Sequence, residues 1–171
     1  MFKIMLVYGA ISGATIIALM LIGMQFGQAN EWFGYLSMLV VLSLIFVGVK
    51  RYRDRALGGV IRFLPALGLG MGIAAVAGVF YVLSWELSLY LTDYGFISDY
   101  KDMMTASYEA KNLGADELAA KLASLETMMT NYRNPLFRLP MTFLEMFPVG
   151  AVVALISAAF LRNPKVLPAR S

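Results

Sequence analysis

Four long hydrophobic runs constrain the fold of this chain more than any other feature. A helix that crosses the ~30 Å hydrocarbon core of a bilayer needs about 20 mostly apolar residues. The runs cover about Ile4–Met24, Phe33–Val49, Leu64–Leu91 and Met141–Leu161. They lack the strict two-residue alternation of membrane-spanning strands. The sequence therefore predicts an all-α membrane protein, a single membrane domain over residues 1–171 with four transmembrane helices.

The composition agrees with this prediction and limits the chemistry that the chain can perform. Only 15% of the residues are charged, against about 25% in soluble domains. The chain has neither Cys nor His, which excludes disulfides, thiol nucleophiles, imidazole bases and the usual zinc or haem ligands. Motifs of phosphate-binding loops and hydrolases are also missing. We expect no enzyme, no catalytic residue, no metal and no cofactor.

The distribution of charge predicts the orientation. Lys and Arg in short loops mark the cytoplasmic side of a membrane. Nine bases and one acid lie in the N-terminus, the basic loop 50–63 and the tail after Leu161, whereas the other connections hold five bases and eight acids. We expect a multi-pass protein of a bacterial inner membrane with both termini in the cytoplasm. We expect no nucleic-acid partner, because no aromatic residues are interleaved with the basic ones as in such surfaces.

A cleaved signal peptide is the alternative for the first run, since Gly27-Gln28-Ala29 resembles a small-residue cleavage site. The apolar part of a signal peptide is typically about 7–15 residues long. The run Ile4–Met24 is longer than this. We therefore expect it to be retained as the first transmembrane helix.

The segment between the third and fourth runs predicts an extracytoplasmic helical hairpin, from about residue 96 to 134. Its two halves carry apolar side chains at helical spacing, namely Ile97, Tyr100, Met104 and Tyr108, then Leu118, Leu122, Leu125, Met129 and Tyr132. We expect Ser98 or Asp99 to cap the first helix and Asn112-Leu113-Gly114 to end it, with Gly114 left-handed. Two lone helices of this length are marginal in water. The hairpin must pack on itself, on the transmembrane helices, on the membrane surface or on a partner.

Two acids inside the apolar runs, Glu86 and Glu145, are the sharpest functional candidates, because an ionisable residue in a span is a functional hypothesis by default. Both fall in the predicted outer half of the membrane. They are either structural and bonded to nearby Trp, Tyr, Ser or Thr side chains, or they bind a cation or shuttle protons, or they contact a partner. If the two carboxyls meet in a low dielectric, they share a proton. Pro148 and Gly150 predict a bend in the fourth helix.

Small residues and clustered bases suggest two kinds of contact. Small residues four positions apart allow close helix packing, either within one bundle or between two copies. The candidates are the pairs Gly9/Gly13 and Gly68/Gly72, together with Gly78, which ends the line Gly70, Ala74 and Gly78. The bases Arg51, Arg53 and Arg55 either serve orientation alone or bind anionic lipid headgroups.

Several stretches resemble the bacterial membrane-protein family filed as domain-of-unknown-function family 4199. The similarity extends over about residues 3–162, in matching order, through Gly34–Met38, Leu44–Asp54, Gly58-Gly59, Phe63, Tyr81–Glu86, Asn134-Pro135, Thr142–Glu145 and Pro148–Gly150. The resemblance implies four spans and an inner-membrane location, and it places Glu86 and Glu145 in recurrent motifs. It implies no reaction and no catalytic residue.

These observations favour a non-enzymatic membrane subunit. We expect an accessory or self-associating protein whose partners are the lipid bilayer and a sister copy or another membrane or envelope protein. The alternative is a small dimeric transporter or lipid translocator that uses Glu86 and Glu145. Four spans are few to enclose a solute path, so this alternative requires a homodimer.

Overall fold

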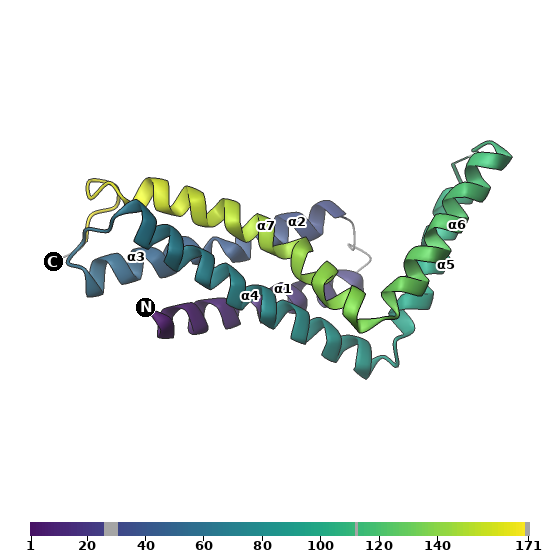
Figure 1. Cartoon of the computed structure of the whole chain (residues 1–171), viewed down its shortest axis with the longest axis horizontal. Coiled ribbons are helices and arrows are strands. Elements are labelled where there is room, and N and C mark those ends of the chain that lie inside the picture. The colour runs from purple at the N-terminus through teal and green to yellow at the C-terminus, as the bar shows by residue number, and fades with distance from the viewer. Residues whose placement is uncertain (26–30, 112, 170–171) are drawn as a thin grey trace. The chain divides into compact units, whose positions relative to one another are not determined.

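The structure is a computed structural model, and it describes residues 1–25, 31–111 and 113–169. The regular elements of these described residues are all helical, as Figure 1 shows. They are α1 (Phe2–Gln25), α2 (Glu31–Leu42), α3 (Leu44–Ala56), α4 (Phe63–Leu91), α5 (Gly95–Glu109), α6 (Ala115–Tyr132) and α7 (Pro135–Leu161). The all-α prediction is confirmed for this part of the chain. The suggested cleavage site at 27–29 lies outside it.

Within the described residues, four helical segments are long and apolar enough to cross a membrane, as the sequence predicts. They are Phe2–Gly23, Trp32–Ala56, Phe63–Leu91 and Pro135–Leu161. The second combines α2 and α3, which meet at Ser43. The fourth begins six residues before the predicted start at Met141. Asn134 explains the earlier start: its Oδ1 accepts a hydrogen bond from the N–H of Leu136 at 3.0 Å, which is a helix cap directly before Pro135 in the first helical position.

The chain divides into two compact units. We call Met1–Ser84 with Phe143–Ser171 the bundle unit, and Trp85–Thr142 the hairpin unit. The bundle unit contains α1, α2, α3 and most of α4 and α7. The hairpin unit contains α5, α6, the end of α4 and the start of α7.

In the bundle unit, α4 packs closely against α1 and α7. A Cβ on Gly13 of α1 would lie 2.4 Å from the carbonyl oxygen of Ala77, and one on Gly9 would lie 2.6 Å from Cβ of Val76. The later glycine of α1 contacts later residues of α4, so α1 and α4 run parallel. On α7, Gly150 meets Ala74 while Ala154 meets Gly70, so α7 runs antiparallel to α4. Glycine and alanine allow this approach of backbones.

The helix α3 completes the bundle core and ends in a glycine turn. Its Gly48 lies against Ile73 of α4 and the ring of Tyr8 of α1. Gly58 and Gly59 have φ of 63° and 92°, a left-handed conformation that glycine adopts without strain. The buried apolar side chains of the unit include Ile16, Ile17, Leu42, Ile45, Val49, Leu69, Ile73 and Leu161.

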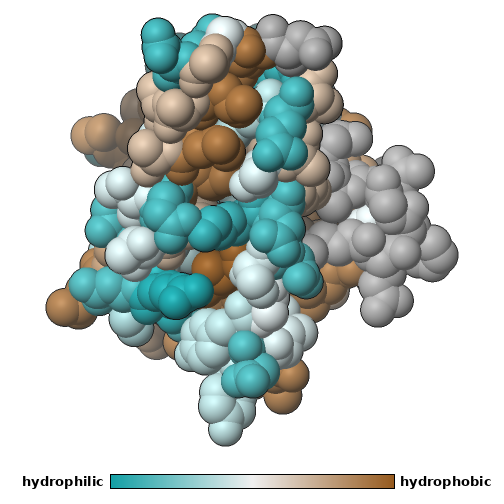
Figure 2. Space-filling model, turned by 90° about the vertical axis from the view of Figure 1, so that its right-hand side faces the viewer, coloured by the Kyte–Doolittle hydropathy of each residue, from teal (hydrophilic) through white to brown (hydrophobic). Residues whose placement is uncertain are grey.

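In the hairpin unit, α5 and α6 pack on each other along the predicted stripes. Ile97, Leu125 and Met129 are buried, and the partly buried side chains around them are Tyr100, Met104, Tyr108, Met128 and Tyr132. The view toward α5 and α6 in Figure 2 shows hydrophilic residues beside hydrophobic ones. The hairpin therefore has an apolar seam of its own.

Two predicted helix ends in the hairpin are wrong. The helix α5 begins at Gly95, before Ser98 and Asp99, and Ser98 Oγ donates instead to the carbonyl of Gly95 at 2.8 Å. Gly114 has φ of −61° and ψ of 151°, so it is extended and precedes α6 instead of closing α5 in a left-handed turn. Asn112 lies outside the described residues.

Candidate functional site

Glu86 and Arg138 form an ion pair inside the hairpin unit. Nε and Nη2 of Arg138 donate to the two carboxylate oxygens of Glu86, each at 2.6 Å. The Arg138 side chain is 1% exposed and the Glu86 side chain 24%. Such a bidentate pair fixes both the distance and the orientation of its partners. It joins the end of α4 to the start of α7.

The third nitrogen of the guanidinium is also satisfied. Nη1 donates to the backbone carbonyls of Tyr132 at 2.9 Å and Arg133 at 3.3 Å. These carbonyls lie at the C-terminal end of α6, where helical carbonyls lack partners and a cation is favoured. The Tyr94 and Tyr132 rings lie 5.5 and 5.8 Å from the Arg138 guanidinium carbon, within cation–π range. Arg138 thus connects α6 to the other two helices.

Trp85 extends this arrangement, which we call the Arg138 cluster: Trp85, Glu86, Tyr94, Tyr132 and Arg138. Nε1 of Trp85 donates to the hydroxyl of Tyr132 at 2.9 Å. The Trp85 ring also meets the Phe96 ring edge-on, with centroids 4.8 Å apart. The cluster therefore continues into the first turn of α5.

The backbone between α4 and α5 brings Tyr94 into the cluster. The N–H groups of Asp93 and Tyr94 donate to the carbonyls of Tyr90, at 3.2 Å, and Leu89, at 2.8 Å. This is the Schellman pattern of a helix end, in which glycine usually takes the left-handed position. Here Asp93 and Tyr94 have φ of 49° and 57°. A left-handed tyrosine is strained, and its contact with Arg138 helps to hold it.

The cluster favours the structural alternative for Glu86, with a partner that the sequence analysis did not name. Both carboxylate oxygens accept hydrogen bonds from Arg138, so Glu86 is the counterion of a guanidinium. Sequence reasoning missed Arg138 because it treats this residue as one more base of the outer segment. The signal available in the sequence was the position of Arg138 shortly after Pro135, a residue that often begins a helix. The structure shows that α7 does begin at Pro135, earlier than predicted, so Arg138 lies inside it.

Glu145 belongs to the bundle unit and has a different environment. Its side chain is exposed, and no hydrogen bond or ion pair joins it to any residue that the structure describes. Pro148 is exposed one turn further along α7, which continues through it without interruption. Gly150 lies at the close contact with Ala74. Among the described residues, Glu145 is therefore an unpaired carboxyl in a segment able to cross a membrane.

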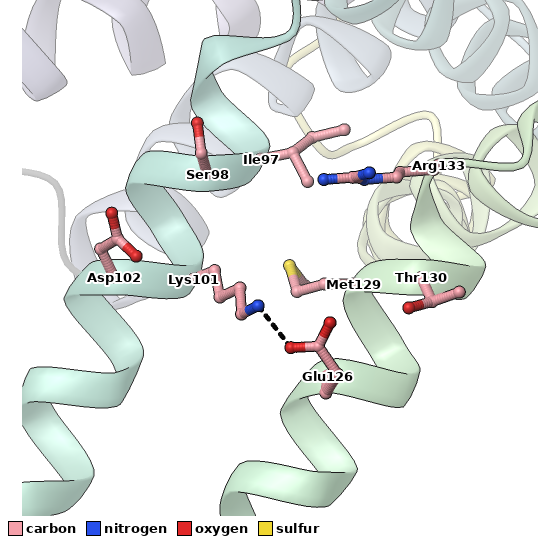
Figure 3. A pocket seen from close by; sticks show the side chains of 8 residues that line it. All are labelled: Ile97, Ser98, Lys101, Asp102, Glu126, Met129, Thr130 and Arg133. Carbon is pink, nitrogen blue, oxygen red and sulfur yellow. Dashed lines mark ion pairs between the residues drawn. The ribbon is translucent and has the colours of Figure 1, made fainter.

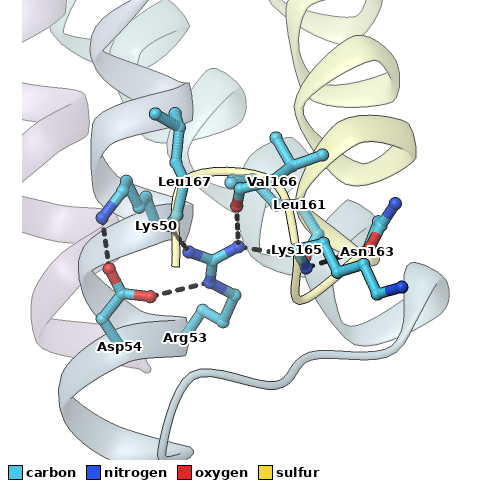
Figure 4. Close-up of polar contacts among 8 residues, drawn as sticks. All are labelled: Lys50, Arg53, Asp54, Leu161, Asn163, Lys165, Val166 and Leu167. Atoms are coloured by element: carbon cyan, nitrogen blue, oxygen red, sulfur yellow. Dashed lines mark hydrogen bonds and ion pairs between the residues drawn. The ribbon is translucent and has the colours of Figure 1, made fainter. Parts of the chain in front are cut away.

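Of the three arginines predicted to meet lipid headgroups, Arg53 is fully buried. Its guanidinium donates to Asp54 and to the backbone carbonyls of Leu161, Val166 and Leu167, as Figure 4 shows. A buried side chain with these partners cannot reach a headgroup, so this part of the prediction is wrong. Arg51 and Arg55 are exposed.

The predicted packing glycines differ in their surroundings. Gly9 and Gly13 face the backbone and side chains of α4, and Gly72 faces the flexible side chain of Met5. A Cβ on Gly78 would lie 2.4 Å from the Phe143 ring. Gly68 has no atom within 4 Å of such a Cβ. Gly70 is another small residue of α4, and it lies against Ala154 of α7.

A cavity of about 270 Å³ lies between α5 and α6 (Figure 3). Lys101 of α5 and Glu126 of α6 form an ion pair across it. Asp102 and Arg133 also line it, so its two bases balance its two acids. No group of three or more acidic side chains among the described residues could hold a metal ion.

The architecture is that of a helical protein with four segments able to cross a membrane. The chain belongs to the family described as protein of unknown function (DUF4199), whose sequence model matches residues 7–163. This match confirms the resemblance noted from the sequence. No curated protein and no solved structure matches the chain.

Proposed function

We propose that this chain is a non-enzymatic subunit of a bacterial inner membrane that binds a sister copy or another envelope protein through the α5–α6 hairpin. The observation that carries this proposal is the Arg138 cluster. It joins the ends of α4 and α6 to the start of α7 through one satisfied guanidinium. A hairpin fixed at its base in this way is preorganised, and preorganisation reduces the entropy lost on binding.

The charge pattern supports the location of the hairpin outside the cytoplasm. Cytoplasmic loops are rich in Lys and Arg, and such residues gather in 50–63 and in the tail, whereas the hairpin segment has more acids than bases. Both termini are then cytoplasmic.

Cysteine labelling tests this orientation. The chain has no cysteine, so a single introduced one reports without background. We expect Ala106→Cys, exposed on α5, to react with an impermeant maleimide in intact cells. The matched control Ala56→Cys, exposed at the end of α3, should react only after the inner membrane is opened. The reverse pattern would overturn the orientation.

Gentle extraction of the full chain from its native membrane tests the binding role. We expect a partner, a second copy or another protein, in fixed ratio with the wild type and with Arg133→Met, but not with Arg138→Met. Arg133 is exposed and adjacent to the cluster, so the two variants lose the same charge. A monomer in every sample, or a complex unaffected by Arg138→Met, would contradict the proposal.

The alternative, a small dimeric transporter, is favoured by Glu145. An unpaired carboxyl in a membrane-spanning segment is a candidate for cation binding or proton transfer. Glu86 no longer supports this alternative, because Arg138 occupies both of its oxygens. A homodimer that survives Arg138→Met, contains no second protein and shows ion or lipid flux that Glu145→Gln abolishes would favour transport.

A further inference from the structure

One end of the bundle unit gathers basic residues from four separate segments. The helices α1 and α4 run parallel and α7 runs the other way, while Arg53 near the end of α3 donates to the carbonyl of Leu161 at the end of α7. This end therefore contains the starts of α1 and α4 and the ends of α3 and α7. Figure 1 shows the N-terminus at this same end. Six exposed bases come from these segments, namely Lys3, Arg51, Arg55, Arg62, Arg162 and Lys165.

Asp54, the acidic side chain that the structure describes at this end, is already neutralised by other bases. Asp54 accepts hydrogen bonds from Lys50 and Arg53, as Figure 4 shows. None of the six exposed bases forms an ion pair with a described acid; Arg51 donates only to the hydroxyl of Tyr8, at 3.4 Å. The surface therefore carries an excess of positive charge without an internal counterion.

The buried Arg53 contributes to this surface although it does not lie on it. Its Nη1 donates to the carbonyl of Val166 at 2.9 Å, and Nη2 donates to that of Leu167. These bonds hold the chain after α7 against α3. Arg162 and Lys165 belong to the held segment, so Arg53 is the positioning residue for two of the six bases.

Large apolar side chains are exposed beside the bases. Phe2 and Leu64 are more than 70% exposed, and the others are Leu57, Val60 and Leu167. At a membrane boundary, apolar side chains enter the acyl region while Lys and Arg reach the headgroups. The mixture of both types fits a lipid interface better than an aqueous protein surface.

We propose that this end of the bundle unit binds anionic phospholipid headgroups of the leaflet that it meets. The argument is charge complementarity: six unpaired cations face a layer of lipid phosphates, and Arg in particular binds phosphate through paired N–H groups. The role is independent of the hairpin and of its partner.

Native mass spectrometry of the full chain in neutral detergent, with equal amounts of phosphatidylglycerol and phosphatidylcholine, tests the proposal. The wild type should retain phosphatidylglycerol preferentially. The triple variant Arg51→Gln, Arg55→Gln, Arg162→Gln should lower this preference about a hundredfold, since each of the three cations near an anionic surface contributes about fivefold. The control variant Lys101→Gln, Lys111→Gln, Lys121→Gln loses the same amount of charge, but from the hairpin unit. It should keep the preference for phosphatidylglycerol.

Equal losses in both triple variants would show a net-charge effect and overturn the proposal, as would an unchanged preference in the first variant. Millimolar inorganic phosphate should not displace the lipid; displacement would reveal a site for the free anion instead. Arg53→Gln should lose part of the preference by releasing Arg162 and Lys165, and an unchanged preference would overturn its positioning role.

Discussion

Replacing Arg138 by methionine is expected to destabilise the hairpin unit by about 3 kcal/mol, because it leaves the Glu86 carboxylate and the α6 carbonyls without their donor. Removing one partner of a buried ion pair typically lowers the free energy of unfolding by about 3–5 kcal/mol. We take the lower value, since Glu86 is about a quarter exposed. Hydrogen–deuterium exchange of the α5 and α6 amides measures the effect locally, and exchange should accelerate about a hundredfold.

Two further variants separate the ion pair from charge and packing. Arg133→Met removes a neighbouring exposed charge and should change exchange little, as surface substitutions usually do. Combining Glu86→Leu with Arg138→Met removes both charges, and we expect part of the stability to return. If the effects of Glu86→Leu and Arg138→Met simply add, the two residues are not energetically coupled and the role assigned to the pair is wrong.

The helices of this chain were predictable because their signals are local. Long apolar runs identify the four possible spans, and the three- and four-residue spacing of apolar side chains identifies α5 and α6. The favourable placement of Asp116 and Glu117 in the first turn of α6 is a local signal of the same kind. Each depends on residues within a few turns of one helix, which periodicity captures well.

The Arg138 cluster was not predictable in the same way. Its two charged residues are 52 positions apart, and no periodic pattern relates them. The left-handed Asp93 and Tyr94 take positions where the sequence offers no glycine, so the helix ends there are not marked by the usual residue. Contacts between residues that are far apart in the sequence decide this geometry, and a single sequence does not show which residues form such contacts.

Arg53 shows a local signal that charge counting overlooks. Ile45, Val49 and Arg53 are all fully buried, and their spacing of four residues places them on one face of α3. Arg51 and Arg55 are four residues apart and share another face, which is exposed. The face of a helix, more than the density of bases, decides which arginine is available to lipid.

Gly13→Ala and Gly68→Ala are expected to have opposite effects, although both place one methyl group on a glycine in a candidate span. A Cβ at Gly13 would lie 2.4 Å from the carbonyl oxygen of Ala77 and 2.8 Å from the backbone nitrogen of Tyr81. Both atoms belong to the backbone of α4, so the added methyl group fits only if α1 and α4 move apart. Overpacking of this kind costs about 1–3 kcal/mol, and Gly13→Leu should be worse.

Gly68 lies on α4 with open space around it, so alanine there should be neutral or stabilise the helix by up to about 1 kcal/mol. Thermal unfolding of the purified variants in one detergent compares them directly, and the midpoint should fall for Gly13→Ala only. Equal midpoints would mean that α1 and α4 are not packed as closely as described. A fall for Gly13→Ala alone is the result expected if Gly13 packs against the backbone of α4 within one chain.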